Sequence, residues 1–223
     1  MKSALLAGML ADASARRILC LHGRGGNAKA FIAHGMAPLL ARASAWEFEA
    51  IDACGPNGAW WTYPAGQRSY SAESYSGADD SIAAVEAALA TGKYCGLLGF
   101  SQGAMLAAVV AARLALGEGD KNAAAHLNFA VICSAALPSP YRPLLERLRS
   151  AGGAPSLPTL HCLSAMDPMN PPELGEELAG CFGDSAQVLW HDAGHDMPPR
   201  DRLDELDQWL LDHQGSGMTG PDA

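Results

Sequence analysis

The sequence has few basic residues: 15 lysines and arginines stand against 24 aspartates and glutamates, which gives a formal net charge of −9 at pH 7. No segment concentrates the basic residues, so nothing offsets the repulsion between this charge and a phosphate backbone. We therefore expect no nucleic acid among the partners. Long apolar runs are also missing, because none approaches the roughly eighteen residues that cross a bilayer. No stable membrane insertion is expected.

Paired cysteines are absent as well. The six cysteines stand singly, with no C-x-x-C motif: Cys20, Cys54, Cys95, Cys133, Cys162 and Cys181. Four of them fall in apolar, strand-like runs, where a free cysteine acts as a small hydrophobic residue. Their distribution favours reduced thiols in a reducing compartment, so we expect a cytoplasmic protein. No cluster of ligand-type residues predicts a metal site.

The first sixteen residues leave a second location open. Lys2 followed by the apolar stretch 4–11 and small residues resembles a short secretory signal. Asp12 and the shortness of the apolar run argue against it, since an N-terminal helix packed on the domain would look the same. A secreted or organellar protein, targeted through residues 1–16, remains the alternative.

At 223 residues with 49% hydrophobic composition, the chain is long enough to bury a core without disulfides. No internal repeat or linker divides it. We expect an N-terminal extension over 1–17, one domain over 18–213 and a flexible tail over 214–223. The sequence leaves open whether the protein is a monomer or a homodimer.

Short runs rich in Ile, Leu and Val alternate with longer helical patterns, which is typical of an α/β fold with a mostly parallel sheet of about six strands and helices on both faces. The expected strands are Ile18–His22, Trp46–Asp52, Tyr94–Phe100, Phe129–Ser134, Thr159–Ser164 and Gln187–His191. The expected helices are Ala28–Arg42, Asp79–Ala90, Gln102–Leu116, Pro143–Ser150, Pro172–Cys181 and Pro199–Asp212.

Two segments rich in glycine and proline, 53–77 and 137–158, each follow an expected strand. In an open parallel sheet, loops at the carboxyl ends of the strands form the ligand site. These two loops are therefore expected to lie beside any active site.

The most specific motif is the G-x-S-x-G pentapeptide of residues 99–103, which stands directly between an apolar run and a helical pattern. A strand that turns sharply into a helix holds the central serine in a strained conformation, and the flanking glycines let strand and helix approach closely. Ser101 would then project at the positive end of a helix, where an oxyanion is favoured. We interpret Ser101 as a nucleophile; the alternative is a serine in an ordinary loop.

A serine hydroxyl needs a general base, and the base needs an orienting carboxylate. With this type of turn the order along the chain is Ser, then Asp or Glu, then His. His195 lies just past the last expected strand and is our candidate base. His191 competes with it, but it falls inside the strand pattern.

Asp167 is the candidate orienting carboxylate, because it immediately follows the fifth expected strand and precedes a helix. Asp192 and Asp196 flank His195 along the chain, where neighbouring side chains rarely turn onto the same imidazole. Asp184 lies outside any strand end. A solvated loop aspartate is the alternative for Asp167.

An oxyanion hole requires two backbone amides, one from the residue after the nucleophile and one from the loop after the first strand. Gln102 supplies the first, and Arg24, in the glycine-rich turn 22–27, is the candidate for the second. The same turn could in isolation bind phosphate. It lacks the lysine and the Ser/Thr of a P-loop and the full G-x-G-x-x-G spacing, which argues against nucleotide binding.

Aromatic residues gather in the 53–77 loop: Trp60, Trp61, Tyr63, Tyr70 and Tyr75. Such a cluster suits the wall of an apolar substrate site, and we take Trp60, Trp61 and Tyr75 as candidate substrate-binding residues. The alternative is a satellite core beneath a long loop.

Several motifs together resemble the FSH family of serine hydrolases: Leu21-His22-Gly23, the Trp60-Trp61 pair, Tyr75-Ser76-Gly77 before Asp79-Asp80-Ser81, and Gly99-Phe100-Ser101-Gln102-Gly103-Ala104. The resemblance runs from about Ile18 to Leu211, with Asp167 and His195 at the later triad positions. The G-F-S-Q-G sequence is also similar to that of acyl-protein thioesterases and small carboxylesterases. The resemblance implies an α/β-hydrolase, usually cytosolic, that cleaves carboxylic esters, often with medium or long alkyl chains.

The sequence therefore predicts a serine esterase that acts on a small-molecule ester through an acyl-enzyme, with Ser101, His195 and Asp167 as a triad. This chemistry requires no cofactor. Three alternatives stay open: a thioesterase, a peptidase on the same triad, and a binding module that kept the fold without the chemistry.

Overall fold

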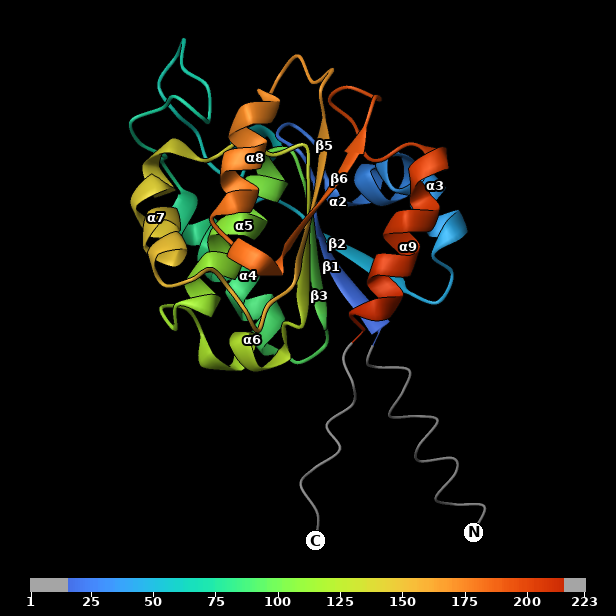
Figure 1. Cartoon of the computed structure of the whole chain (residues 1–223). Coiled ribbons are helices and arrows are strands. Elements are labelled where there is room, and N and C mark those ends of the chain that lie inside the picture. The colour runs from blue at the N-terminus through green and yellow to red at the C-terminus, as the bar shows by residue number, and fades with distance from the viewer. Residues whose placement is uncertain (1–15, 215–223) are drawn as a thin grey trace, which may run out of the picture.

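A computed structural model describes residues 16–214 of the chain. Its centre is a single sheet of six parallel strands in the order β2-β1-β3-β4-β5-β6 (Figure 1). The strands are β1 (Arg17–Leu21), β2 (Glu47–Ile51), β3 (Gly96–Phe100), β4 (Phe129–Cys133), β5 (Thr159–Ser164) and β6 (Ala186–His191). The predicted α/β class, the parallel sheet and the number of strands are confirmed.

Helices cover both faces of the sheet, with α4 to α8 on one face and α2, α3 and α9 on the other (Figure 1). The α-helices are α2 (Ala28–Ala30), α3 (Ala37–Arg42), α4 (Ala78–Ala90), α5 (Gln102–Ala115), α6 (Lys121–His126), α7 (Arg142–Ser150), α8 (Pro172–Gly180) and α9 (Leu203–Asp212). Each face has its own buried hydrophobic cluster. Because β3, β4 and β5 lie between the two clusters, their side chains are almost all buried.

Two expected helices are interrupted. The segment 28–42 contains a π-helical turn, η2 (Phe31–Gly35), between α2 and α3, and the amide of Met36 donates to the carbonyl of Phe31. Pro38 stands in the first turn of α3, where its missing amide is tolerated, so a new helix begins there. The last helix starts with a 3₁₀ turn, η6 (Arg200–Arg202), before α9.

Helix α6 was not predicted. Asp120 caps it by accepting hydrogen bonds from the amides of Asn122 and Ala123, at 2.8 and 2.9 Å. The capping aspartate was visible in the sequence, but six residues are too few for a periodic hydrophobic pattern to emerge. Short capped helices of this kind escape prediction from periodicity.

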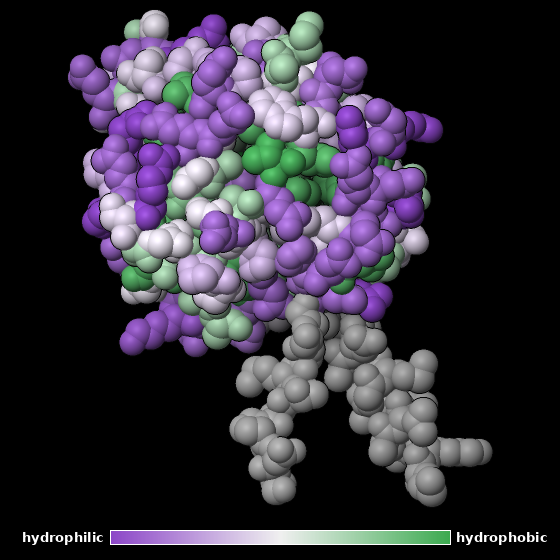
Figure 2. Space-filling view, in the orientation of Figure 1, coloured by the Kyte–Doolittle hydropathy of each residue, from purple (hydrophilic) through white to green (hydrophobic). Residues whose placement is uncertain are grey.

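The predicted extension and tail fall almost wholly on residues 1–15 and 215–223, which lie outside the described part, so the division into domains stays a prediction. No helix between residues 16 and 214 is long and apolar enough to span a membrane. The face drawn in Figure 2 is mostly hydrophilic, with hydrophobic surface gathered over β6. Val188 and Trp190 of that edge strand are partly exposed, at 41% and 38%.

Helix α5 lies unusually close to the sheet. A Cβ at Gly103 would overlap the carbonyl oxygens of Leu21 and His22, and one at Gly99 would overlap the backbone of Gly103 and Ala104. Nearly every side chain of α5 is buried as a result. The two glycines of the pentapeptide therefore allow β3 to pass directly into α5, as the motif predicts.

Gly103→Ala should lower the free energy of unfolding by about 1–3 kcal/mol, because the added methyl group forces α5 away from the end of β1. Gly180→Ala, in α8, is the matched control: its Cβ would meet only the end of Arg149, at 3.8 Å. Urea denaturation of both variants checks this. Equal stability of the two variants would contradict the close-packing account.

Candidate active site

Ser101 is the single residue between β3 and α5. Its φ and ψ are 54° and −118°, a combination that L-residues rarely adopt. The Ser101 amide donates to the carbonyl of Cys133 at 2.9 Å, which anchors the turn to the neighbouring strand β4. Backbone strain of this kind costs about 1–3 kcal/mol and persists only where the surrounding packing enforces it.

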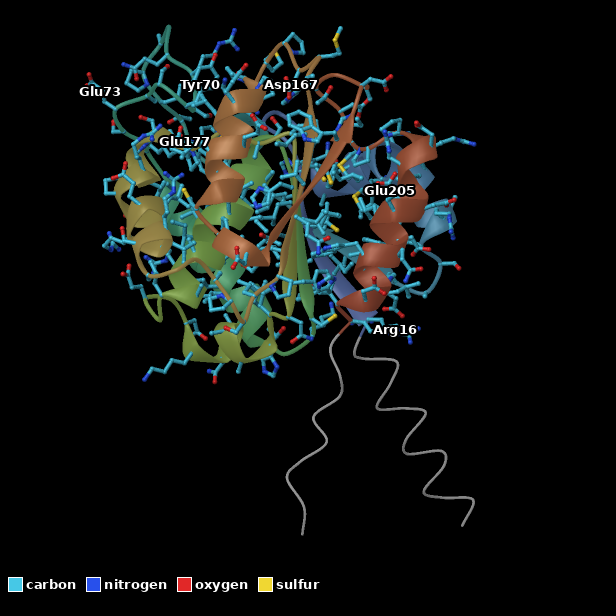
Figure 3. The ribbon with its side chains drawn as sticks, viewed as in Figure 1. Arg16, Tyr70, Glu73, Asp167, Glu177 and Glu205 are labelled. Carbon is cyan, nitrogen blue, oxygen red and sulfur yellow. The ribbon has the colours of Figure 1, made fainter. Side chains whose placement is uncertain are left out.

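The structure brings together the three residues predicted as a triad. The Ser101 Oγ lies 2.9 Å from Nε2 of His195, and Nδ1 of His195 lies 2.8 Å from Oδ2 of Asp167. Asp167 follows β5 and His195 follows β6, so both stand on loops at the carboxyl ends of their strands. The labelled Asp167 and Tyr70 lie at the same end of the molecule, opposite Arg16 (Figure 3).

The carboxylate of Asp167 is held from two sides. Its second oxygen, Oδ1, accepts hydrogen bonds from the amides of Met169 and Asn170 at 2.8 and 2.9 Å. Only 3% of the Asp167 side chain is exposed, so these bonds, rather than water, satisfy the carboxylate. Asp192 and Asp196, the other aspartates near His195, are exposed. Geometry thus favours Asp167 over both as the partner of His195.

Two serines that the sequence did not reveal connect the loops of the site. Ser164 Oγ accepts hydrogen bonds from the amides of Met166 and Gly194, at 3.2 and 3.1 Å, and so joins the loop of Asp167 to the loop of His195. Ser134, just after β4, donates from Oγ to the carbonyl of Asp196 at 2.9 Å. Both hydroxyls fix backbone groups, and nothing in the sequence motif signals such contacts.

His191, the rival base, is not the imidazole that bonds to Ser101. It is buried at the end of β6, and its Nδ1 accepts a hydrogen bond from the amide of Ala193 at 3.2 Å. Burial lowers the pKa of His191 below its ordinary value, chiefly because the charged form is desolvated. The imidazole is thus a structural group within the base loop.

The predicted oxyanion-hole residues both border Ser101. Gln102 is the first residue of α5, and its amide therefore lies at the positive end of that helix. The glycine-rich turn packs against the serine, since a Cβ at Gly23 would come within 3.4 Å of the Ser101 Cβ. Arg24 is the next residue of this turn. The two amides thus belong to segments that meet at Ser101.

The side chain of Gln102 joins α5 to the aromatic loop. Its Oε1 accepts from the amide of Trp60 and its Nε2 donates to the carbonyl of Trp61, both at 3.0 Å. The Trp60 indole donates to the carbonyl of His22 at 2.7 Å. The double tryptophan therefore fixes the positions of Gln102 and of the glycine-rich turn.

The expectation that Trp60, Trp61 and Tyr75 line the substrate site is wrong for the tryptophans, which are 0% and 1% exposed within the core. Tyr75 stacks on Trp61 with 4.5 Å between ring centroids, and it is absent from the cavity wall. The alternative of a satellite core under the loop describes these three residues. Long-range packing decides which aromatic residues face solvent, and composition does not reveal it.

Beside Ser101 lies a cavity of about 330 Å³. Ser101 and His195 form part of its wall together with Gln102 and Asn170. The rest of its wall comes from the glycine-rich turn, the 53–77 loop, β3, α5 and the Asp167 loop: Gly23, Arg24, Tyr63, Arg68, Ser69, Tyr70, Phe100, Met105 and Met169. Tyr63 and Tyr70 are the aromatic residues of the 53–77 loop that reach it.

The arrangement can activate a hydroxyl for attack on a carbonyl carbon. Nε2 of His195 is positioned to take the proton of Ser101, and Asp167 is positioned to orient the ring and to stabilise its charged form. The carbonyl would sit in the cavity beside free amides at a helix N-terminus. This combination is suited to acyl transfer.

Comparisons with known proteins agree with this chemistry. A family model described as serine hydrolase (FSH1) matches residues 36–205. The chain is 36% identical over 145 residues to esterase OVCA2 of Danio rerio, covering 62% of this chain and 60% of that protein. It is 30% identical over 222 residues to a probable esterase of Aspergillus terreus, covering 82% and 83% of the two chains. The chain thus spans less than two thirds of the zebrafish relative.

Solved structures share the fold. The structure of esterase PE8 superimposes with a TM-score of 0.66 at 22% identity, covering 89% of this chain and 92% of that one. Acyl-protein thioesterase 2 of Zea mays gives the same TM-score and identity over 90% and 94%. At this level of identity the likeness establishes a common α/β-hydrolase fold.

His195 and His191 can be distinguished by covalent labelling of Ser101 with a fluorophosphonate. His195→Gln should reduce the labelling rate by at least about 100-fold, because the variant lacks the base that takes the serine proton. His191→Gln is the matched control and should label at close to the wild-type rate. Intact-protein mass spectrometry follows both reactions, and a loss confined to His191→Gln would reverse the assignment.

Proposed function

The chain belongs to the FSH1 family of serine hydrolases, and from this premise we propose that it is a serine esterase that cleaves small carboxylic esters through an acyl-enzyme on Ser101. The family match agrees with the resemblance that the sequence motifs indicate. The observation that carries the proposal is the unbroken hydrogen-bonded chain from Ser101 through His195 to Asp167 beside a cavity.

In the first half of the proposed reaction, Ser101 Oγ transfers its proton to Nε2 of His195 and attacks the ester carbonyl carbon. The negative charge that develops on the carbonyl oxygen is stabilised by the amides of Gln102 and Arg24. The imidazolium then protonates the leaving alkoxide, and an alcohol departs. Asp167 keeps the proton of neutral His195 on Nδ1, so that Nε2 is free to act as the base.

In the second half, water enters and gives its proton to Nε2 as it attacks the acyl-enzyme. The second tetrahedral intermediate collapses, Ser101 recovers its proton, and the carboxylic acid leaves. The same three residues thus act in both halves with reversed proton transfers. The strained backbone of Ser101 supports this cycle because it keeps Oγ at one position between the base and the two amides.

The cavity supports a small substrate. At about 330 Å³ it is near the lower end of the usual range for ligand sites, and Tyr63, Tyr70, Phe100, Met105 and Met169 supply an apolar wall. A short or medium acyl chain fits such a space. A cytoplasmic location and the choice between monomer and homodimer stay predictions.

Asp167→Asn should lower kcat by about 10⁴-fold while leaving the fold intact, because an asparagine favours the wrong imidazole tautomer. Asp192→Asn removes an exposed carboxylate of the His195 loop that is not among the hydrogen-bond partners of the ring, so it should retain wild-type kcat. Steady-state hydrolysis of p-nitrophenyl butyrate measures both. Similar losses in the two variants would contradict the role given to Asp167.

Ester hydrolysis should exceed the other acyl-transfer reactions. With matched butyryl compounds, the oxygen ester should have the highest kcat/KM, the thioester a lower one, and the anilide none above background. Ser101→Ala should abolish every rate that wild type shows. A thioester preference would favour the thioesterase alternative, and no Ser101-dependent turnover in well-folded protein would favour the binding module.

A further inference from the structure

The charged groups of the cavity wall have one sign. Among the described residues that line it, Arg24 and Arg68 are present and no carboxylate is. The chain as a whole carries a net charge of −9, so cations are the minority among its charged side chains. The overall composition predicts that carboxylates outnumber cations at most sites. The wall that contains Ser101 instead has two arginines and, within residues 16–214, no carboxylate.

Neither of these two arginines is paired with a carboxylate, a state that they share with Arg16, Lys29, Lys121, Arg149 and Arg200 among residues 16–214. Between residues 16 and 214, seven lysines and arginines are paired with carboxylates within 4 Å: Arg17, Arg42, Lys93, Arg113, Arg142, Arg147 and Arg202. The guanidinium of Arg24 instead donates to the neutral hydroxyl of Tyr63 at 3.1 Å and lies 5.0 Å from the centroid of that ring. That of Arg68 has no hydrogen-bond or ion-pair partner between residues 16 and 214. Neither arginine of the cavity wall therefore has a carboxylate at ion-pair distance in the described part of the chain.

The backbone under Arg68 is fixed, although its guanidinium is free. The Arg68 amide donates to Ser71 Oγ at 3.1 Å, and its carbonyl accepts from the amides of Ser71 and Ala72. The next residue, Ser69, accepts at its carbonyl from the hydroxyl of Tyr75 and from the amide of Ser139. A well-anchored turn thus places Arg68, whose guanidinium is unpaired, in the wall of the cavity that Ser101 lines.

From this juxtaposition we propose that the substrate carries an anionic oxyacid group, a carboxylate or a phosphate, in addition to the ester that is cleaved. Arg68 binds this group, and Arg24 of the glycine-rich turn adds a second positive charge to the same cavity wall. A guanidinium binds such groups through two parallel hydrogen bonds, which fixes orientation as well as adding affinity. The proposal rests on the esterase function and adds a specificity to it. Arg68 is a binding residue for the anionic group. The apolar wall contacts the hydrocarbon part of the substrate that joins this group to the ester.

Matched substrates test the proposal on both sides of the ester. On the acyl side, p-nitrophenyl hydrogen adipate is compared with p-nitrophenyl hexanoate, which has the same chain length and no charge. On the alcohol side, 4-acetoxybenzoate and 4-acetoxyphenyl phosphate are compared with the neutral 4-acetoxybenzamide. Rates in Ser101→Ala are subtracted as background. In at least one set, kcat/KM should be about tenfold or more higher for the anion, and about 0.5 M salt should reduce that ratio.

Arg68→Gln should bring the ratio of anionic to neutral kcat/KM close to one. Lys121→Gln is the matched control: it removes the same charge from α6, at the opposite end of the molecule (Figure 1), and should leave both the ratio and the rates unchanged. Comparing kcat/KM for 4-acetoxyphenyl phosphate with that for 4-acetoxybenzoate shows whether a phosphate or a carboxylate is preferred.

Two results would overturn the proposal, and they are distinguishable. Ser101-dependent hydrolysis with no preference for an anion, or with a preference that Arg68→Gln leaves intact, removes the anion site and leaves the esterase standing. The absence of Ser101-dependent turnover for every ester removes both.

Discussion

Strand β3 passes into helix α5 through one residue, and the rest of the site depends on that passage. Ser101 adopts a positive φ, and its amide is bonded to β4. Gly99 and Gly103 let the helix come close enough for its N-terminus to lie over the end of β1. The close approach of β3, α5 and β1 therefore brings the Ser101 hydroxyl, the Gln102 amide and the glycine-rich turn together.

The base and the acid reach Ser101 from two other strands, so their loops need independent support. Hydrogen bonds from loop backbone to Asp167 and to the hydroxyl of Ser164 supply it, and the Ser134 hydroxyl adds a tie to the base loop. The aromatic loop is held in a similar way through Gln102. Fixed partners of this kind are what preorganisation requires, because a geometry set before substrate binding costs nothing to organise during the reaction.

Much of this could be predicted from the sequence because its signals are local. The pentapeptide between an apolar run and a helical pattern specified Ser101, and the chain order of strands and loops pointed to Asp167 and His195. What failed depended on distant contacts. Burial of Trp60 and Trp61 follows from bonds to Gln102 and His22, some forty residues away. The roles of Ser134 and Ser164 likewise appear only once the loops are folded together.

The central claim is that Ser101 forms a covalent acyl-enzyme, and rapid mixing with excess p-nitrophenyl butyrate tests it most directly. A burst of p-nitrophenol, with a butyryl group located on the peptide of Ser101 by mass spectrometry after acid quench, is the predicted result. Wild-type turnover by Ser101→Ala, or a butyryl group found only on another residue, would contradict it.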